Sequence, residues 1–151
     1  MQKLLVIAST NTNKVREFQT LFSKDKDLKI LGLCDLVDHP EIVDETSDTY
    51  AGNAFLKADY WFQRLQVPIL SDDSGLEVES LNGWPGVISA RIAATDKDCR
   101  EALITRLIQN GHFGLSGANG AKARFVCVLC LRASGLTRYF EGILPGTIRN
   151  I

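Results

Sequence analysis

Short apolar runs alternate along this chain with longer segments in which apolar residues recur every three or four positions. Such runs are typical of buried strands, and the longer period is typical of helices that bury one face. The pattern predicts strands at 4–8, 28–33, 69–71, 76–79 and 122–131, a hairpin partner at 138–142, and helices at 14–22, 49–65 and 95–108. Alternating strands and helices indicate an α/β layered domain.

Capping residues, prolines and glycines mark the predicted ends of the helices and strands. The helix at 49–65 has candidate caps at 47–49, and Pro68 prevents its continuation. A capping box at 95–98 begins the last helix. The segment 113–121 is predicted to be a glycine-rich loop, and 145–151 to be the beginning of another strand.

Composition and charge argue against two classes of protein, nucleic-acid-binding proteins and membrane-spanning proteins. The net charge is −1, from 17 basic and 18 acidic residues, so nothing indicates nucleic-acid binding as the main role. No apolar run approaches the roughly 18 residues of a membrane span. With no linker or repeat, we expect a single domain over 1–151 in a cytoplasmic protein.

The cysteines and histidines indicate neither a redox centre nor a zinc site. Cys127 and Cys130 lie in one apolar run, and positions three apart on a strand point to opposite faces. We expect buried structural thiols. His39 and His112 have no partners at zinc-binding spacing.

The most informative segment is Ser71-Asp72-Asp73-Ser74-Gly75, directly after an apolar run. Adjacent carboxylates repel each other unless a cation or a proton relieves them, and oxygen ligands suit Mg²⁺. The segment therefore favours metal-assisted chemistry on a phosphorylated substrate. A solvated turn is an equally good interpretation of the segment alone.

A polar segment between the first strand and the first helix is a candidate phosphate site. It consists of Ser9, Thr10, Asn11, Thr12, Asn13 and Lys14. Amides at a helix N-terminus attract anions, and the lysine adds a positive charge. Helix capping by Asn11 or Thr12 is the alternative, although a cation in the first turn opposes the helix dipole.

Glu45 and Lys57 are weaker candidates. Glu45 lies in the acidic loop before the second helix and could reach the same cation as Asp73; a solvated loop acid is the alternative. Lys57 lies among apolar neighbours, where its side chain could instead extend to solvent.

Together these motifs, in this order and spacing, resemble the inosine triphosphate pyrophosphatase family. The resemblance covers essentially the whole chain, and the block from Asp72 to Arg91 is its most specific part. Its motifs are Ser9-x-Asn11-x-x-Lys14-x-x-Glu17, Glu45-Thr46, Asn53-Ala54-x-x-Lys57-Ala58, Asp72-Asp73-Ser74-Gly75-Leu76-x-Val78, Leu81-Asn82-Gly83-x-Pro85-Gly86-Val87-x-Ser89-Ala90-Arg91, Ala123-Arg124-Phe125, Phe140-Glu141-Gly142 and Pro145-Gly146.

The resemblance implies a three-layer α/β fold, with a mixed and mostly buried sheet flanked by helices. It implies hydrolysis of ITP, dITP and XTP to the monophosphate and pyrophosphate, with Mg²⁺ as cofactor, and homodimer formation. Asp73 would be the general base and, with Glu45 and Asp72, a metal ligand. Ser9 to Lys14, Lys57 and Ser74 would bind the triphosphate.

Two later motifs of the family, a Phe-Gly-Tyr-Asp-Pro loop and a lysine followed by Ser-His-Arg, do not occur in this sequence. In the family they contact the base, so their absence bears on purine selectivity and turnover. We therefore expect a family enzyme with a shortened C-terminal part. The alternatives are a non-catalytic nucleotide-binding remnant and a Maf-type pyrophosphatase.

Overall fold

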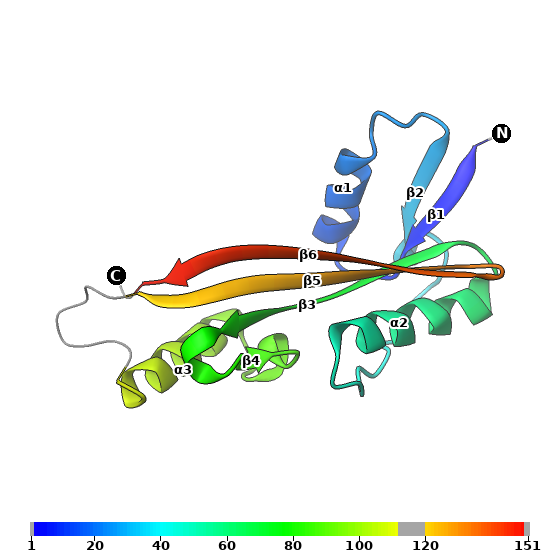
Figure 1. The fold of residues 1–151 in the computed structure, drawn as a ribbon. Helices are drawn as coiled ribbons and strands as arrows, with labels where there is room; N and C mark the ends of the chain where they lie inside the picture. Colours follow the sequence, from blue (N-terminus) through cyan, green and yellow to red (C-terminus); the bar gives the residue numbers. More distant parts are fainter. Residues whose placement is uncertain (1, 112–119, 150–151) are drawn as a thin grey trace. The chain divides into compact units, whose positions relative to one another are not determined.

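The computed structural model describes residues 2–111 and 120–149 and shows an α/β fold (Figure 1). The elements are β1 (Lys3–Ile7), α1 (Thr12–Leu21), β2 (Leu28–Gly32), α2 (Tyr50–Leu65), β3 (Ile69–Val78), β4 (Pro85–Gly86), α3 (Asp96–Gln109), β5 (Ala121–Ala133) and β6 (Leu136–Ile148), with 3₁₀ turns at Leu33–Asp35, Glu79–Leu81 and Ser89–Arg91. No helix in the described part of the chain is long and apolar enough to cross a membrane.

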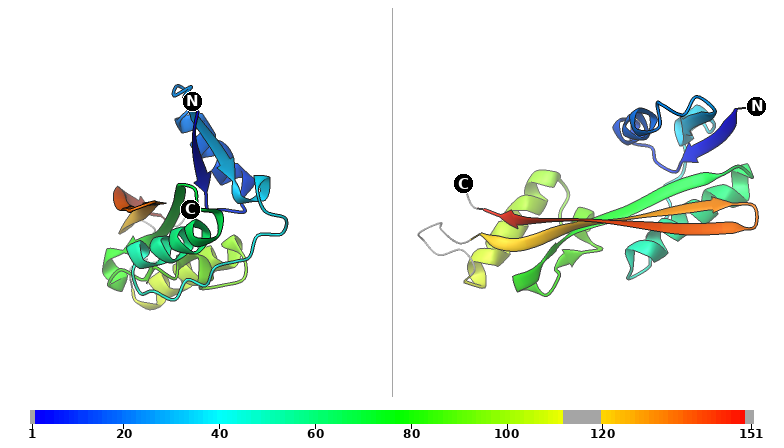
Figure 2. Two further views of the ribbon diagram at one scale, coloured as in Figure 1. Left: turned by 90° about the vertical axis from the view of Figure 1, so that its right-hand side faces the viewer. Right: turned by 45° about the horizontal axis from the view of Figure 1, so that its top comes forward.

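The strands form one mixed sheet, which confirms the predicted fold class. Its order is β2-β1-β3-β5-β6, and the short strand β4 pairs with β3. Strand β1 is parallel to both β2 and β3, with Val6 opposite Ile69. Strands β5 and β6 form a long hairpin (Figure 2). The segment expected to begin a new strand at 145 is instead the end of β6, up to Ile148.

The chain packs as two compact units. The first contains residues 1–73 and 128–140, and the second contains residues 74–127 and 141–151. Three long strands, β3, β5 and β6, contribute one part to each unit. Each unit has its own hydrophobic core.

The first unit has three layers because alternate strand residues face different helices. On β1, Val6 belongs to the core cluster that contains Ala54, Ala58 and Phe62 of α2. Its neighbours Leu5 and Ile7 belong to the cluster that contains Val15 of α1. The sheet of this unit is therefore covered by α1 on one face and by α2 on the other.

The second unit is built around α3. Leu103 and Leu107 pack against Val78 and Leu81, with Trp84 at the edge of this cluster. The helix begins as the capping box predicts, because the Thr95 hydroxyl accepts a hydrogen bond from the Asp98 amide at 3.1 Å.

Two local predictions were wrong or could not be compared. The acidic segment expected as a turn between two strand pieces is the middle of the continuous strand β3. The glycine-rich segment 113–121 and His112 lie almost entirely outside the described residues.

Candidate active site

The two adjacent aspartates lie on a strand, and this decides where their side chains point. Asp72 and Asp73 are both largely buried on β3. Successive residues of a strand face opposite sides of the sheet. Leu70 packs in the cluster of α1, whereas Ile69 packs in that of α2, and Ser71 donates a hydrogen bond to the carbonyl of Ala54 in α2. The even-numbered Asp72 therefore faces α1, and the odd-numbered Asp73 faces α2.

On the α1 face, Asp72 pairs with the first-turn lysine. The Lys14 Nζ lies 2.7 Å from Asp72 Oδ2, with the lysine side chain about one-third exposed. The sequence indicated that a cation in the first turn opposes the helix dipole. The buried carboxylate opposite compensates for this cost, and it fixes the direction of the ammonium group.

The beginning of α1 is capped by its own asparagine. Asn11 Oδ1 accepts hydrogen bonds from the amides of Asn13 at 2.9 Å and Lys14 at 3.4 Å, and the Asn11 amide donates to Ser9 Oγ. The capping alternative is therefore confirmed for Asn11. Because these two amides already have an acceptor, an anion here would depend chiefly on the Lys14 ammonium and on hydroxyl groups.

Hydroxyl groups from this segment line a small pocket in the first unit. Ser9, Thr10 and Thr12 contribute to a concavity of about 220 Å³, together with residues of α1 and of the segment after β2. The pocket lies at the carboxyl end of β1, where ligands bind in open α/β sheets. Its position agrees with the polar segment as a candidate binding site.

On the α2 face, Asp73 is held by an asparagine. Asn53 is fully buried, and its Nδ2 donates a hydrogen bond to Asp73 Oδ2 at 3.1 Å. The Oδ1 of the same side chain accepts a hydrogen bond from the Ser47 amide at 2.9 Å. One amide side chain therefore connects the acidic strand with the loop before α2.

The same loop carries Glu45, which pairs with α2 one turn further along. The Lys57 Nζ lies 2.5 Å from Glu45 Oε1, and both side chains are about one-quarter exposed or less. Residues four apart on a helix lie on one face. Because Asn53 contacts Asp73 and Lys57 contacts Glu45, the two carboxylates are held by neighbouring positions of α2, and Lys57 is an ion-pair partner within the site.

These oxygen atoms are of the type that Mg²⁺ prefers, and Asp73 is largely buried. Glu45 and Asp73 are both bound to side chains on one face of α2, which fits a shared ion. Asp72 was expected as a third ligand, but its carboxylate lies on the α1 face with Lys14. Among residues 2–111 and 120–149, no three histidine, cysteine or acidic side chains form a ready metal-binding group.

The sequence interpretation placed Asn53 in a motif but gave it no role. A polar residue on the otherwise apolar buried face of α2, three positions after Tyr50 and one before Ala54, is the signal that could have identified it. Ser74, expected in the phosphate site, is the first residue of the second unit and its side chain is exposed.

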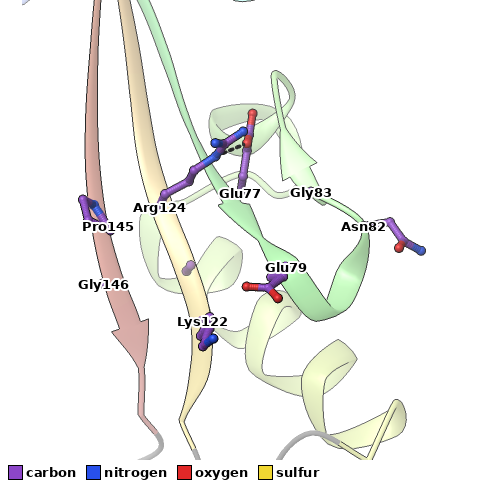
Figure 3. A pocket seen from close by; sticks show the side chains of 9 residues that line it. Glu77, Glu79, Asn82, Gly83, Lys122, Arg124, Pro145 and Gly146 are labelled. Atoms are coloured by element: carbon purple, nitrogen blue, oxygen red, sulfur yellow. Dashed lines mark hydrogen bonds and ion pairs between the residues drawn. The ribbon is translucent and has the colours of Figure 1, made fainter.

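The second unit contains a separate pocket of about 450 Å³. Glu77 and Arg124 point toward each other there, with Arg124 Nε 2.7 Å from Glu77 Oε2, and Lys122 and Glu79 lie nearby (Figure 3). Charges of both signs line it, so it has no clear preference for an anion or a cation. Arg124 belongs to one of the motifs of the family resemblance, but the residues predicted to bind substrate do not line this pocket.

Several curated proteins of similar sequence share a functional name. The chain is 40% identical over 147 residues to a dITP/XTP pyrophosphatase of Flavobacterium psychrophilum, a match that covers 95% of this chain and 72% of the relative. It is 36% identical to a dITP/XTP pyrophosphatase of Staphylococcus aureus over 97% of this chain and 71% of the relative. A dITP/XTP pyrophosphatase of Geobacillus kaustophilus is 43% identical over 136 residues, 88% of this chain and 63% of the relative.

Solved structures agree with this similarity. The Ham1 protein of Staphylococcus aureus matches with a TM-score of 0.78 at 34% identity, over 96% of this chain and 71% of that protein. A HAM1 protein of Coxiella burnetii matches with a TM-score of 0.81 at 29% identity, over 97% of this chain and 73% of that protein. The family model described as Ham1 family matches residues 5–150. The resemblance inferred from the motifs is thus confirmed, and the chain belongs to the Ham1 family.

Proposed function

We propose that this protein is a nucleoside triphosphate pyrophosphatase that removes non-canonical purine nucleotides, namely ITP, dITP and XTP, from the nucleotide pool. The observation that supports it most is the set of contacts in the first unit, where Lys14 pairs with Asp72, Lys57 pairs with Glu45, and Asn53 binds Asp73. The family match and the names of the curated relatives support the substrate class.

In the proposed reaction, water hydrolyses the bond between the α- and β-phosphates, and the products are the nucleoside monophosphate and pyrophosphate. Asp73 accepts the proton from the attacking water, because it is the carboxylate held by Asn53 at the middle of β3. Lys14 and Lys57 bind phosphate oxygens, with Ser9, Thr10, Asn11, Thr12, Asn13 and Ser74 as further polar contacts. Binding of a polyphosphate would exchange two intramolecular ion pairs for contacts to the substrate.

We propose Mg²⁺ as the cofactor, with Glu45 and Asp73 as its protein ligands. When bound, the ion would neutralise charge on the phosphate oxygens. In this proposal Asp72 acts mainly by directing Lys14, to which it is paired. Loss of activity in excess EDTA, and its recovery with added Mg²⁺, is the expected result.

The comparisons favour this function over the two alternatives, a non-catalytic remnant and a Maf-type enzyme. We also propose that the protein acts in the cytoplasm, where it would meet the nucleotide pool, and that it forms a homodimer, as the family resemblance implies. Sedimentation equilibrium of the purified chain would test the homodimer.

A substrate panel tests the proposed function. The purified chain would be incubated with dITP, XTP, dATP and dTTP in Mg²⁺, and the products separated by anion-exchange chromatography. The proposal predicts monophosphate and pyrophosphate in equal amounts, with dITP and XTP preferred. Release of single phosphates, or preference for dTTP, would contradict it.

A further inference from the structure

We infer that Asn53 is a positioning residue, which uses the two ends of one side chain to hold Asp73 and the loop at 41–49 in a fixed relation. The inference rests on the proposed function only where it concerns catalysis. Its structural part, the connection between loop and strand, can be tested without any substrate.

The orientation of the Asn53 amide is determined by its partners. The Ser47 backbone N–H can only donate, so the side-chain atom that it meets at 2.9 Å must be the carbonyl Oδ1. The NH₂ group then faces Asp73, where Nδ2 lies 3.1 Å from Oδ2. A donor in this position needs an acceptor opposite, and the carboxylate of Asp73 supplies it. The arrangement therefore holds one oxygen of Asp73 in a defined direction.

Burial makes this arrangement costly to break. Asn53 is 0% exposed and Asp73 is 7% exposed, so neither group can exchange its partner for bulk water. A buried polar group that loses its partner keeps the full cost of desolvation. The amide should accordingly remain in this orientation throughout the catalytic cycle.

The loop that Asn53 holds through Ser47 also contains Glu45, the second candidate metal ligand. Glu45 precedes Ser47 by two residues, and its carboxylate is bound by Lys57, one helical turn after Asn53. The hydrogen bond to Ser47 therefore restrains the backbone beside Glu45. Asn53 thus sets the separation of the two carboxylates that we propose as metal ligands, without touching the substrate itself.

Two substitutions of Asn53 distinguish its contact to Asp73 from its contact to Ser47. Asn53→Asp keeps an acceptor for the Ser47 amide but replaces the donor toward Asp73 by an oxygen. Asn53→Leu is of similar volume and removes both contacts. Gln63→Glu is the matched control, because it makes the same amide-to-acid change at an exposed position of the same helix.

Amide hydrogen exchange of Ser47 is the first measurement. We expect protection in the wild type, in Asn53→Asp and in Gln63→Glu, and a loss of roughly tenfold or more in Asn53→Leu, the effect of one net hydrogen bond. If neither Asn53 variant folds, the protection of the Ser47 amide in the wild type tests the inference on its own. An unprotected Ser47 amide in the wild type would overturn the inference.

Steady-state kinetics of pyrophosphate release from dITP are the second measurement. We expect kcat to fall on the order of 100-fold in both Asn53 variants, with KM changed much less, because the loss is one of positioning. Wild-type kcat in a folded Asn53→Asp protein would overturn the positioning role. A wild type that releases no pyrophosphate would instead refute the proposed function, and the exchange measurement would still test the connection.

Discussion

At the scale of single residues, the alternation of a strand explains how two neighbouring aspartates can be buried together. Asp72 and Asp73 do not share one solvent pocket, because they face α1 and α2 respectively. Each carboxylate has its own partner, a lysine for Asp72 and an amide for Asp73. The sequence singled out both aspartates as candidate metal ligands but placed them in a turn, so their division between the two faces of the sheet was not predicted.

Lys14 should matter for substrate binding more than other surface lysines. We expect Lys14→Met to lower kcat/KM for dITP by about 10- to 100-fold, because a hydrogen bond between charged groups contributes about 1.5–3 kcal/mol. Lys24→Met removes the same charge from an exposed position after α1 and serves as the control. Equal kinetics for the two variants would count against a phosphate-binding role for Lys14.

The cysteines should differ sharply in reactivity. Burial raises the pKa of the Cys130 thiol to about 11, whereas Cys34 is exposed. Only the thiolate reacts with alkylating agents, so at pH 8 iodoacetamide should modify Cys34 in the native protein and Cys130 only after unfolding. Mass spectrometry of tryptic peptides would show this, and rapid modification of Cys130 in the native state would contradict the structure.

The raised pKa of the Cys130 thiol also makes the free energy of unfolding depend on pH. The ordinary pKa of the thiol is 9.0, so above pH 9 the unfolded chain loses the proton while the folded protein keeps it up to about pH 11. Ionisation then favours the unfolded state, and the free energy of unfolding should fall between these pH values. Urea titrations should show a smaller fall for Cys130→Ala; an identical pH dependence would exclude this cause.

At the scale of elements, the first turn of α2 holds the loop at 41–49 by close packing as well as by hydrogen bonds. A Cβ added to Gly52 would lie 2.0 Å from Ser47 Oγ and 2.7 Å from its Cβ. Ser47 Oγ also accepts a hydrogen bond from the Thr49 amide. Glycine at position 52 is therefore required by the approach of the loop to the helix.

Gly52→Ala should accordingly destabilise the protein, although alanine is the better helix former by about 1 kcal/mol. We expect the free energy of unfolding to fall by about 1–3 kcal/mol through overpacking. Gly142→Ala is the control, because an added Cβ there meets nothing within 4 Å. Thermal melting of both variants checks this prediction, and a higher Tm for Gly52→Ala would show that the loop moves aside freely.

Most elements were predictable from local pattern because their signals are local. The three helices begin and end within about two residues of the predicted positions, since caps, glycines and Pro68 fix these boundaries. The continuity of β3 was not predictable in this way. Asp, Ser and Gly favour a turn by propensity, but here they are extended within β3, which lies between β1 and β5 in the sheet.

At the scale of the whole molecule, the motifs predicted the family, which the comparisons confirm, and provided candidate site residues, but they did not predict the contacts between those residues. The pairs Lys14–Asp72 and Lys57–Glu45 span 58 and 12 residues of sequence, and no local pattern specifies such contacts. The role of Asn53 was missed for the same reason. The division into two units was also not predicted, because it follows from contacts along three long strands and not from a linker.

The central claim is that Asp73, held on β3 within the first unit, performs the hydrolysis of a non-canonical purine triphosphate. The most direct test compares initial rates of pyrophosphate release from dITP by the wild type and by Asp73→Asn, with both shown to be folded by circular dichroism. We predict a loss of about 10²–10⁴-fold in kcat for Asp73→Asn, the range that general acid–base catalysis contributes. Equal rates for the two folded proteins would contradict the account.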